Sequence, residues 1–212
     1  MKRKLFCVVL SGAAFLPAGM VYSGIIGLPH DFSSETWNTG GEICMPCHTP
    51  HNGSVTLGTP LWDHEVTAAA FVPYSSGTMD ATVPEPSDSS KACLSCHDGT
   101  VAVDSFGGNT GGQEFLTGRF SLGTDLSNDH PVSFTYDTAL AIADGELFDP
   151  SAATIPSLPN SPTIDAGLLI DGKLECASCH DVHANKGFAE LSNAMLIINN
   201  EASGLCLTCH NK

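Results

Sequence analysis

The chain has 212 residues and a formal net charge of −15, from 8 basic and 23 acidic side chains. This length suits one domain or two small ones. The acidic excess argues against nucleic acid and anionic lipid as partners, because either would require a basic surface.

The first 23 residues have the pattern of a secretory signal peptide. A basic start at residues 2–4 precedes an apolar run from Leu5 to Leu16, and small residues lead to a cleavage site after Ser23. The alternative is an uncleaved membrane anchor, but the apolar run is short for a span. We therefore predict an exported protein, in the periplasm, on the outer cell surface or outside the cell. After cleavage no stable membrane insertion is expected, and five basic against 23 acidic residues leave a charge of −18.

The eight cysteines that follow Ser23 all belong to CxxCH units. The units are Cys44–Cys47–His48, Cys93–Cys96–His97, Cys176–Cys179–His180 and Cys206–Cys209–His210. This is the attachment signature of haem c, in which both thiols form thioethers with the porphyrin and the histidine binds the iron as proximal ligand. Zinc sites and disulfides are the alternatives, but zinc has no use for a histidine after every second cysteine. We therefore expect four haem c groups.

The four units alternate between two kinds, which indicates an internal duplication. The first and third continue as "CHTPHN" and "CHDVHAN", and the second and fourth have no second histidine. We therefore predict a first haem-pair half at residues 24–110 and a second at 111–212, together forming one compact domain. The division is expected in the glycine-rich stretch 107–113.

The second histidine of each CHxxH unit is expected to bind a neighbouring haem. Three residues of chain span at most about 10 Å, which is too short to pass around the ring edge from His180 to the opposite face of its own haem. His183, and likewise His51, would therefore reach a different iron and hold two haems close together. The alternative is a hydrogen bond from either histidine to a propionate or a carbonyl.

Five histidines remain for the second axial position after the four proximal ones are counted. The distal candidates are His30, His51, His64, His130 and His183. Four irons need four such ligands, so every haem can be bis-histidine. Methionine is the competing ligand, with Met45, Met79 and Met195 as candidates.

The distal candidates stand in different contexts. His64 lies beside Trp62, whose ring could cover a porphyrin, and His130 precedes Pro131, which favours an extended backbone. A solvent-facing or hydrogen-bonded histidine is the alternative for both. His30 follows the cleavage site closely, so it can ligate within its own chain, be the spare histidine, or reach a neighbouring molecule.

Signals for regular secondary structure are sparse along the rest of the chain. Residues 75–90 and 148–163 are predicted to be loops, 132–136 a short strand, and 187–196 the best separate helix. The CxxCH turns are expected to be helical. We predict a coil-rich multihaem cytochrome with a few short helices and minimal β structure, in which four covalently bound haems form the core. Removal of haem should therefore unfold it.

Several segments resemble the doubled-CxxCH multihaem cytochromes over most of the mature chain. They are "PHDFS", "ICMPCHTPHNG", "PLWDHE", "CLSCHDGTVAVDS", "DLSNDHPVSF", "CASCHDVHAN" and "LCLTCH". With four haems and an export signal, the chain is similar to the tetrahaem outer-surface cytochromes of OmcE type, which form filaments. The resemblance implies bis-histidine haems, a coil-rich fold and one distal histidine donated between subunits of a homopolymer.

The sequence thus predicts an electron-transfer protein that is not an enzyme and that conducts electrons through closely spaced bis-histidine haems. It would act as a filament subunit or as a soluble periplasmic shuttle, with redox proteins or extracellular acceptors as partners. The alternatives are a multihaem reductase with one open iron and a haem subunit of a larger oxidoreductase. The histidine count disfavours the reductase.

Overall fold

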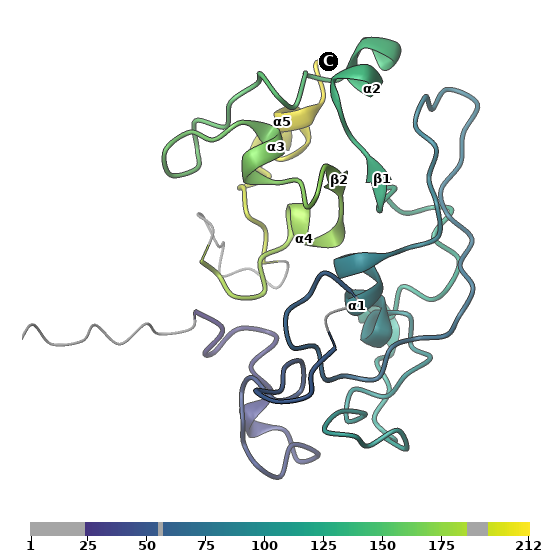
Figure 1. The fold of residues 1–212 in the computed structure, drawn as a ribbon, viewed down its shortest axis with the longest axis vertical. Helices are drawn as coiled ribbons and strands as arrows, with labels where there is room; N and C mark the ends of the chain where they lie inside the picture. Colours follow the sequence, from purple (N-terminus) through teal and green to yellow (C-terminus); the bar gives the residue numbers. More distant parts are fainter. Residues whose placement is uncertain (1–23, 55–56, 186–194) are drawn as a thin grey trace, which may run out of the picture.

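The computed structural model describes residues 24–54, 57–185 and 195–212, and most of this chain is coil joined by short elements (Figure 1). The predicted fold class, coil-rich with a few short helices and minimal β structure, is confirmed. The α-helices are α1 (Asp88–His97), α2 (Thr138–Asp144), α3 (Ile164–Gly167), α4 (Cys176–Cys179) and α5 (Cys206–Cys209). The 3-10 helices are η1 (Phe32–Ser34), η2 (Gly118–Phe120) and η3 (Glu201–Ser203), and the strands are β1 (Phe134–Thr135) and β2 (Lys173–Leu174).

The early residues and α1 occupy the lower part of Figure 1, and α2, α3 and α5 occupy the upper part, with α4 facing α1 between them. Residues that follow the glycine-rich stretch 107–113 form backbone hydrogen bonds with residues that precede it. The amide of Leu122 donates to the His97 carbonyl at 2.6 Å, and Val103 donates to Glu114 at 2.7 Å. The boundary between 110 and 111 stays a prediction, and these hydrogen bonds connect its two sides.

Three of the four CxxCH turns are helical, as predicted. The second unit ends α1, and the third and fourth form α4 and α5. The prediction is wrong for the first unit, which is a turn: the His48 amide donates to the Cys44 carbonyl at 2.8 Å, but no helix follows. Pro46 lies inside this turn and brings no N–H group with which to extend a helical ladder.

The prediction of a loop over residues 75–90 is wrong for its last three residues, because α1 begins at Asp88. Its first turn consists of polar residues that also favour loops, and Lys91 donates to the Ser87 carbonyl at 3.0 Å. A carboxylate in the first turn also interacts favourably with the helix dipole. The loop predicted for 148–163 is confirmed, because α3 begins at Ile164.

Capping residues mark both ends of α2 and the start of α3. The Asp137 carboxylate accepts the Leu140 amide at 2.8 Å and starts α2, and Gly145 ends it in the left-handed region at φ 73°. Thr163 caps α3 through the Ala166 amide at 3.3 Å. These local signals mark where each helix begins and, for α2, where it ends.

The two strands pair antiparallel, with Phe134 opposite Leu174 and Thr135 opposite Lys173. The predicted strand at 132–136 is confirmed, though only two of its residues are paired in a ladder. The pairing places the segment around Phe134 directly beside the residues that lead into α4.

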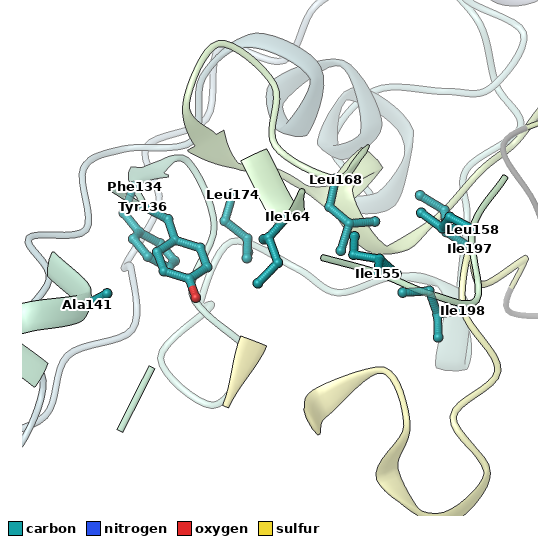
Figure 2. Close-up of a cluster of buried hydrophobic side chains, with 10 residues drawn as sticks. All are labelled: Phe134, Tyr136, Ala141, Ile155, Leu158, Ile164, Leu168, Leu174, Ile197 and Ile198. Carbon is teal, nitrogen blue, oxygen red and sulfur yellow. The ribbon is translucent and has the colours of Figure 1, made fainter. Parts of the chain in front are cut away.

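Apolar side chains from the second part of the chain pack into one core, shown in Figure 2. Its buried members are Phe134, Tyr136, Ala141, Ile155, Leu158, Ile164, Leu168, Leu174, Ile197 and Ile198. A smaller cluster of Phe71, Leu94 and Leu126 lies in the first part. The sequence did not predict the larger core, because its members are spread over β1, β2, α2, α3 and coil, and no one segment carries a long apolar periodicity.

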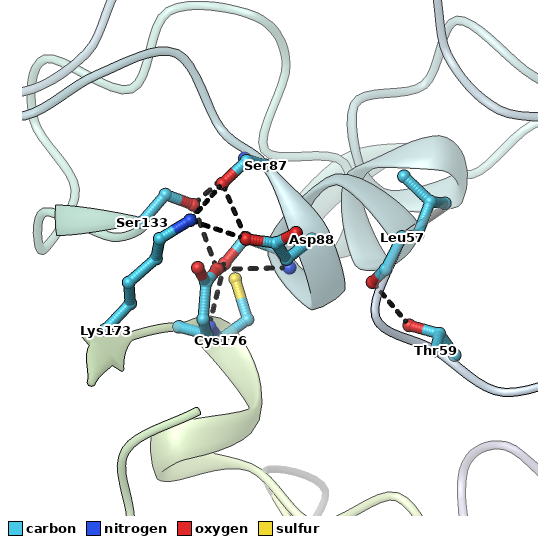
Figure 3. Close-up of polar contacts among 9 residues, drawn as sticks. Leu57, Thr59, Ser87, Asp88, Ser133, Lys173 and Cys176 are labelled. Carbon is cyan, nitrogen blue, oxygen red and sulfur yellow. Dashed lines mark hydrogen bonds and ion pairs between the residues drawn. The ribbon is translucent and has the colours of Figure 1, made fainter. Parts of the chain in front are cut away.

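A buried polar network joins α1 to α4 (Figure 3). The Glu175 carboxylate accepts the hydroxyls of Ser90 and Ser133, the latter at 2.9 Å, and the Ser90 hydroxyl in turn accepts the Cys176 amide at 2.9 Å. Beside it, Lys173 pairs with Asp88 at 2.7 Å. The network fixes the start of the third CxxCH unit against the helix that carries the second.

The helix predicted for 187–196 lies largely outside the described residues. No helix within the described ranges has the length and apolar character required to cross a membrane.

Candidate functional site

Each CxxCH unit brings its two thiols and its histidine onto one turn of chain. In the third and fourth units the histidine amide donates to the carbonyl of the first cysteine, from His180 to Cys176 and from His210 to Cys206, each at 3.0 Å. The helical turn ends at this histidine, since His180 and His210 each have an extended backbone. The imidazole therefore projects at the end of the turn, next to the second thiol.

Four of the eight thiols, one in every unit, lie in environments that disfavour a thiolate. Burial raises the pKa of Cys47 to about 11 and that of Cys179 to about 11, and it raises the pKa values of Cys96 and Cys209 to about 12. An uncharged sulfur suits such sites. A thioether sulfur is uncharged, so these residues fit covalent haem attachment better than metal–thiolate binding.

Thiols from two different units meet at the contact between α1 and α4. Cys93 and Cys176 hydrogen-bond each other, which raises the pKa of Cys93 and lowers that of Cys176. The attachment positions of the second and third units are therefore neighbours, although 83 positions separate them in the sequence.

Backbone carbonyls orient two of the proximal histidines. The Nδ1 atom of His48 lies 2.7 Å from the Pro60 carbonyl oxygen, and that of His97 lies 2.8 Å from the Phe120 oxygen. A carbonyl can only accept, so Nδ1 carries the proton and Nε2 keeps its lone pair. This is the arrangement that a metal-binding histidine uses.

Three histidine rings from outside the CxxCH units face three rings from inside them. The ring centroids are 6.1 Å apart for His48 and His183, 6.0 Å for His30 and His97, and 6.5 Å for His130 and His210. Ordinary ring contacts also span about 4.5–7 Å, but each of these pairs joins one proximal histidine to one distal candidate.

The separations leave room for an iron between the rings. Two imidazole nitrogens that each lie about 2 Å from one metal are about 4 Å apart, and their ring centres are about 2 Å further apart in total. The observed 6.0–6.5 Å agrees with this arrangement. The chain's own residues thus fit the axial ligation of haem.

The distal members of these pairs come from separate segments. The Nδ1 atom of His130 lies 2.9 Å from the Pro131 carbonyl oxygen, which again leaves Nε2 available. His30 has a pKa lowered to about 4, first by burial and then by His97, His180 and His183, so its ring is neutral at pH 7. Among the residues that the structure describes, its buried Nδ1 atom has no hydrogen-bond partner, which is consistent with a site built for a further group.

The remaining two candidates differ in exposure. His64 is 4% exposed, and its Nδ1 and Nε2 atoms lie 2.8 Å and 3.1 Å from the carbonyl oxygens of Glu65 and Ala102. Its Nε2 atom is also 3.4 Å from the Cys96 sulfur. His51 is exposed, and its carbonyl accepts the Thr49 hydroxyl at 3.1 Å. Trp62 packs edge-on against His48, with ring centroids 6.2 Å apart.

The methionine alternatives stay untested. Met195 is 5% exposed and Met45 is 40% exposed. Among the described residues, no group of three or more His, Cys, Asp or Glu side chains is arranged to bind a metal ion on its own.

Comparison with known proteins supports the interpretation of the last two units. Residues 170–212 match the family model described as the doubled CXXCH motif. The match covers the third and fourth units and supports a haem-binding protein of the multihaem c-type cytochrome kind, with covalently bound haem c and a role in electron transfer. Proteins of this kind are typically exported. No curated protein matches the chain.

Sequence reasoning missed the residues that orient the ligands. The carbonyls of Pro60, Phe120 and Pro131 are backbone groups that no motif identifies. The Asp181 carboxylate is buried and accepts hydrogen bonds from the CHxxH segment, and its position directly after a CxxCH unit was the available signal.

Proposed function

We propose that the chain is an exported tetrahaem c-type cytochrome that conducts electrons through closely spaced bis-histidine haems. The observation that carries this proposal is the set of three ring pairs, each joining a CxxCH histidine to a histidine from a distant segment. Such pairing is required if both faces of an iron are to be occupied and no substrate is to bind there.

Each haem, when bound, supplies an iron that accepts and returns one electron. The eight cysteines fix the macrocycles covalently, and His48, His97, His180 and His210 are the proximal ligands. His183, His30 and His130 would supply the second histidine ligand at the units of His48, His97 and His210, respectively. The ligand paired with His180 comes from the remaining candidates, His51 and His64.

The pairing connects the two predicted halves. His183 belongs to the second half and faces His48 of the first. Because His183 follows His180 by three residues, one short segment contacts the first and third haem sites. The haems of the two halves are therefore neighbours in one continuous electron path.

The purified native protein tests this function directly. Its mass should exceed that of residues 24–212 by four haems, and the ferric spectrum should be low-spin throughout. A high-spin ferric fraction that binds small ligands would instead favour the reductase, and a mass equal to that of the bare polypeptide without a Soret band would refute the proposal.

We further propose that the protein is a subunit of an extracellular filament, as its resemblance to the OmcE-type cytochromes implies. His51 is exposed, and the exposed apolar side chains of Met45 and Leu61 lie close to it in sequence. A second copy that met this region would bury them and could receive His51 as an axial ligand. Electron microscopy of secreted material tests this: ordered fibres are expected from wild type and none from H51A, whereas fibres formed by H51A would refute the role of His51.

A further inference from the structure

The Asp181 carboxylate organises the segment that connects the third haem site to the first. One oxygen, Oδ1, accepts the His183 amide at 3.0 Å, and the other, Oδ2, accepts the Asn185 amide at 2.7 Å. The Asp181 backbone is also held, since its amide donates to the Met195 carbonyl at 2.8 Å and its carbonyl accepts the Ala184 amide at 3.2 Å. The residue is 7% exposed, so these bonds form largely away from water.

These hydrogen bonds close a tight turn around His183. Ala184 adopts the left-handed region at φ 51°, which a non-glycine residue occupies only when its surroundings impose it. From the other side, Gly24 packs so closely that an added Cβ atom would lie 2.7 Å from the His183 carbonyl oxygen. The backbone of His183 is therefore held between Asp181 and the segment that begins at Gly24.

The direction of the His183 ring follows from this turn. The ring lies nearly parallel to that of His48, at an interplanar angle of 24° and a centroid distance of 6.1 Å. A free segment after His180 would sample many directions, and holding one of them requires contacts that replace the lost conformational entropy. Two charge-assisted hydrogen bonds supply such contacts.

The other units differ from this one either in the residue at the position of Asp181 or in the residue two positions later. In the first CHxxH unit the corresponding residue is Thr49, whose hydroxyl donates to the His51 carbonyl instead of accepting an amide. Asp98 follows His97 in the same way as Asp181 follows His180 and is buried at 4% exposure. Its Oδ1 atom likewise accepts the amide two residues on, from Thr100 at 2.7 Å, and the carboxylate also accepts the hydroxyls of Thr67 at 2.5 Å and Thr100 at 2.9 Å. Residue 100 is a threonine, however, and not a histidine. Asp98 is thus a matched control without a distal histidine to orient.

We propose that Asp181 is a positioning residue that directs His183 onto the iron of the haem attached at Cys44 and Cys47, opposite His48. This inference rests on the proposed function, because it requires His183 to be an axial ligand. Asp181 does not touch the iron, and it acts only through the backbone of the turn.

The experiment compares the full mature holoprotein in wild type, D181A, D181N, H183A and D98A. Mass spectrometry first establishes that each variant carries four haems. The readouts are the high-spin fraction of the ferric protein and the number of carbon monoxide molecules bound per reduced protein, because only an iron with an open face binds carbon monoxide. A general loss of stability without ligand release would not produce one open iron among four.

Wild type and D98A should bind no carbon monoxide, and H183A should bind one molecule per protein. D181A should bind a substantial fraction of one, and the double variant D181A/H183A should bind no more than H183A, because both changes open the same iron. D181N keeps one acceptor for the two amides and should lie between wild type and D181A. If D181A does not mature, the partial opening of D181N decides the question.

The possible failures are distinguishable. Wild type without haem refutes the proposed function, and H183A that stays closed refutes the ligation by His183. If H183A opens one iron while D181A, or D181N where D181A does not mature, stays fully low-spin and binds no carbon monoxide, Asp181 is not a positioning residue. Equal opening in D98A would also refute the proposal, because the effect would then not depend on His183.

Discussion

Replacing Glu175 by Gln is expected to change how the stability of the protein depends on pH. Glu175 is fully buried, with 0% exposure, and burial raises the pKa of its carboxyl group above the usual value of 4.5, while hydrogen bonds from Ser90 and Ser133 lower it in part. Within the described residues its Oε1 atom has no hydrogen-bond partner. The charged form is therefore incompletely compensated in the folded state.

The sign of the effect follows from proton binding. Between the unfolded and folded pKa values, the folded protein keeps the proton of Glu175 and the unfolded chain has released it. The stability contribution of this group is therefore fully present below 4.5 and is lost as the pH rises through the folded pKa. Within this window the free energy of unfolding falls by up to about 1.4 kcal/mol per pH unit. Glutamine does not titrate and removes this dependence.

Denaturant unfolding of the holoprotein measures the difference at pH values on both sides of 4.5. The fluorescence of Trp37 and Trp62 reports unfolding, since haem at the proposed sites of the first and second units would quench it in the folded state. The stability of E175Q relative to wild type should increase as the pH rises through this window. E175A provides a second comparison, because each Ser hydroxyl left without an acceptor costs about 1–3 kcal/mol. Equal pH dependences for wild type and E175Q would refute the inference that the buried carboxylate is destabilised.

Three further substitutions test the packing and the polar contacts by the same measurement. Ile164→Ala, at a core position with 0% exposure, should lower the free energy of unfolding by about 2–5 kcal/mol, whereas Ile142→Ala, at 76% exposure, should change it by no more than about 0.5 kcal/mol. Tyr136→Phe removes a hydrogen bond of 2.6 Å to the Phe148 carbonyl and should cost about 1 kcal/mol; an unchanged stability would mean that water replaces the hydroxyl. Lys173→Met breaks the pair with Asp88, whose members are each 35% exposed, and should cost less than about 1 kcal/mol because solvent screens the pair; a larger loss would show that Lys173 also supports the Glu175 network.

The parts of the fold that the sequence predicted are those set by local chemistry. Three of the four CxxCH turns, the loop at 148–163 and the strand near Phe134 follow from spacing, proline content and alternation within a few residues. The core around Ile164 was not predictable in this way. Its members come from short helices, short strands and coil, and their burial depends on distant partners, as Leu158 and Ile197 show.

In the candidate site, too, the residues within one motif could be predicted, and the pairs formed between distant segments could not. The identity of the thioether cysteines and of the proximal histidines can be predicted from sequence, because one motif contains them. The partner of each distal histidine cannot be predicted, since His48 and His183 meet only after the chain has folded. The reach of three residues excluded the haem of His180 as the target of His183, but it did not identify the haem of His48.

Long-range polar contacts also fix α4, in the second predicted half, against α1, in the first. Ser90 and Glu175 are 85 positions apart in the sequence, and their hydrogen bonds place the start of α4 against α1. The next residue, Cys176, donates its amide to the same Ser90 hydroxyl, and its thiol contacts Cys93. Both thiols are attachment points in the proposed cytochrome, so the separation of the second and third haems depends on this serine–carboxylate contact. A change at Ser90 or Glu175 would therefore act on the electron path between the halves without altering any cysteine or histidine.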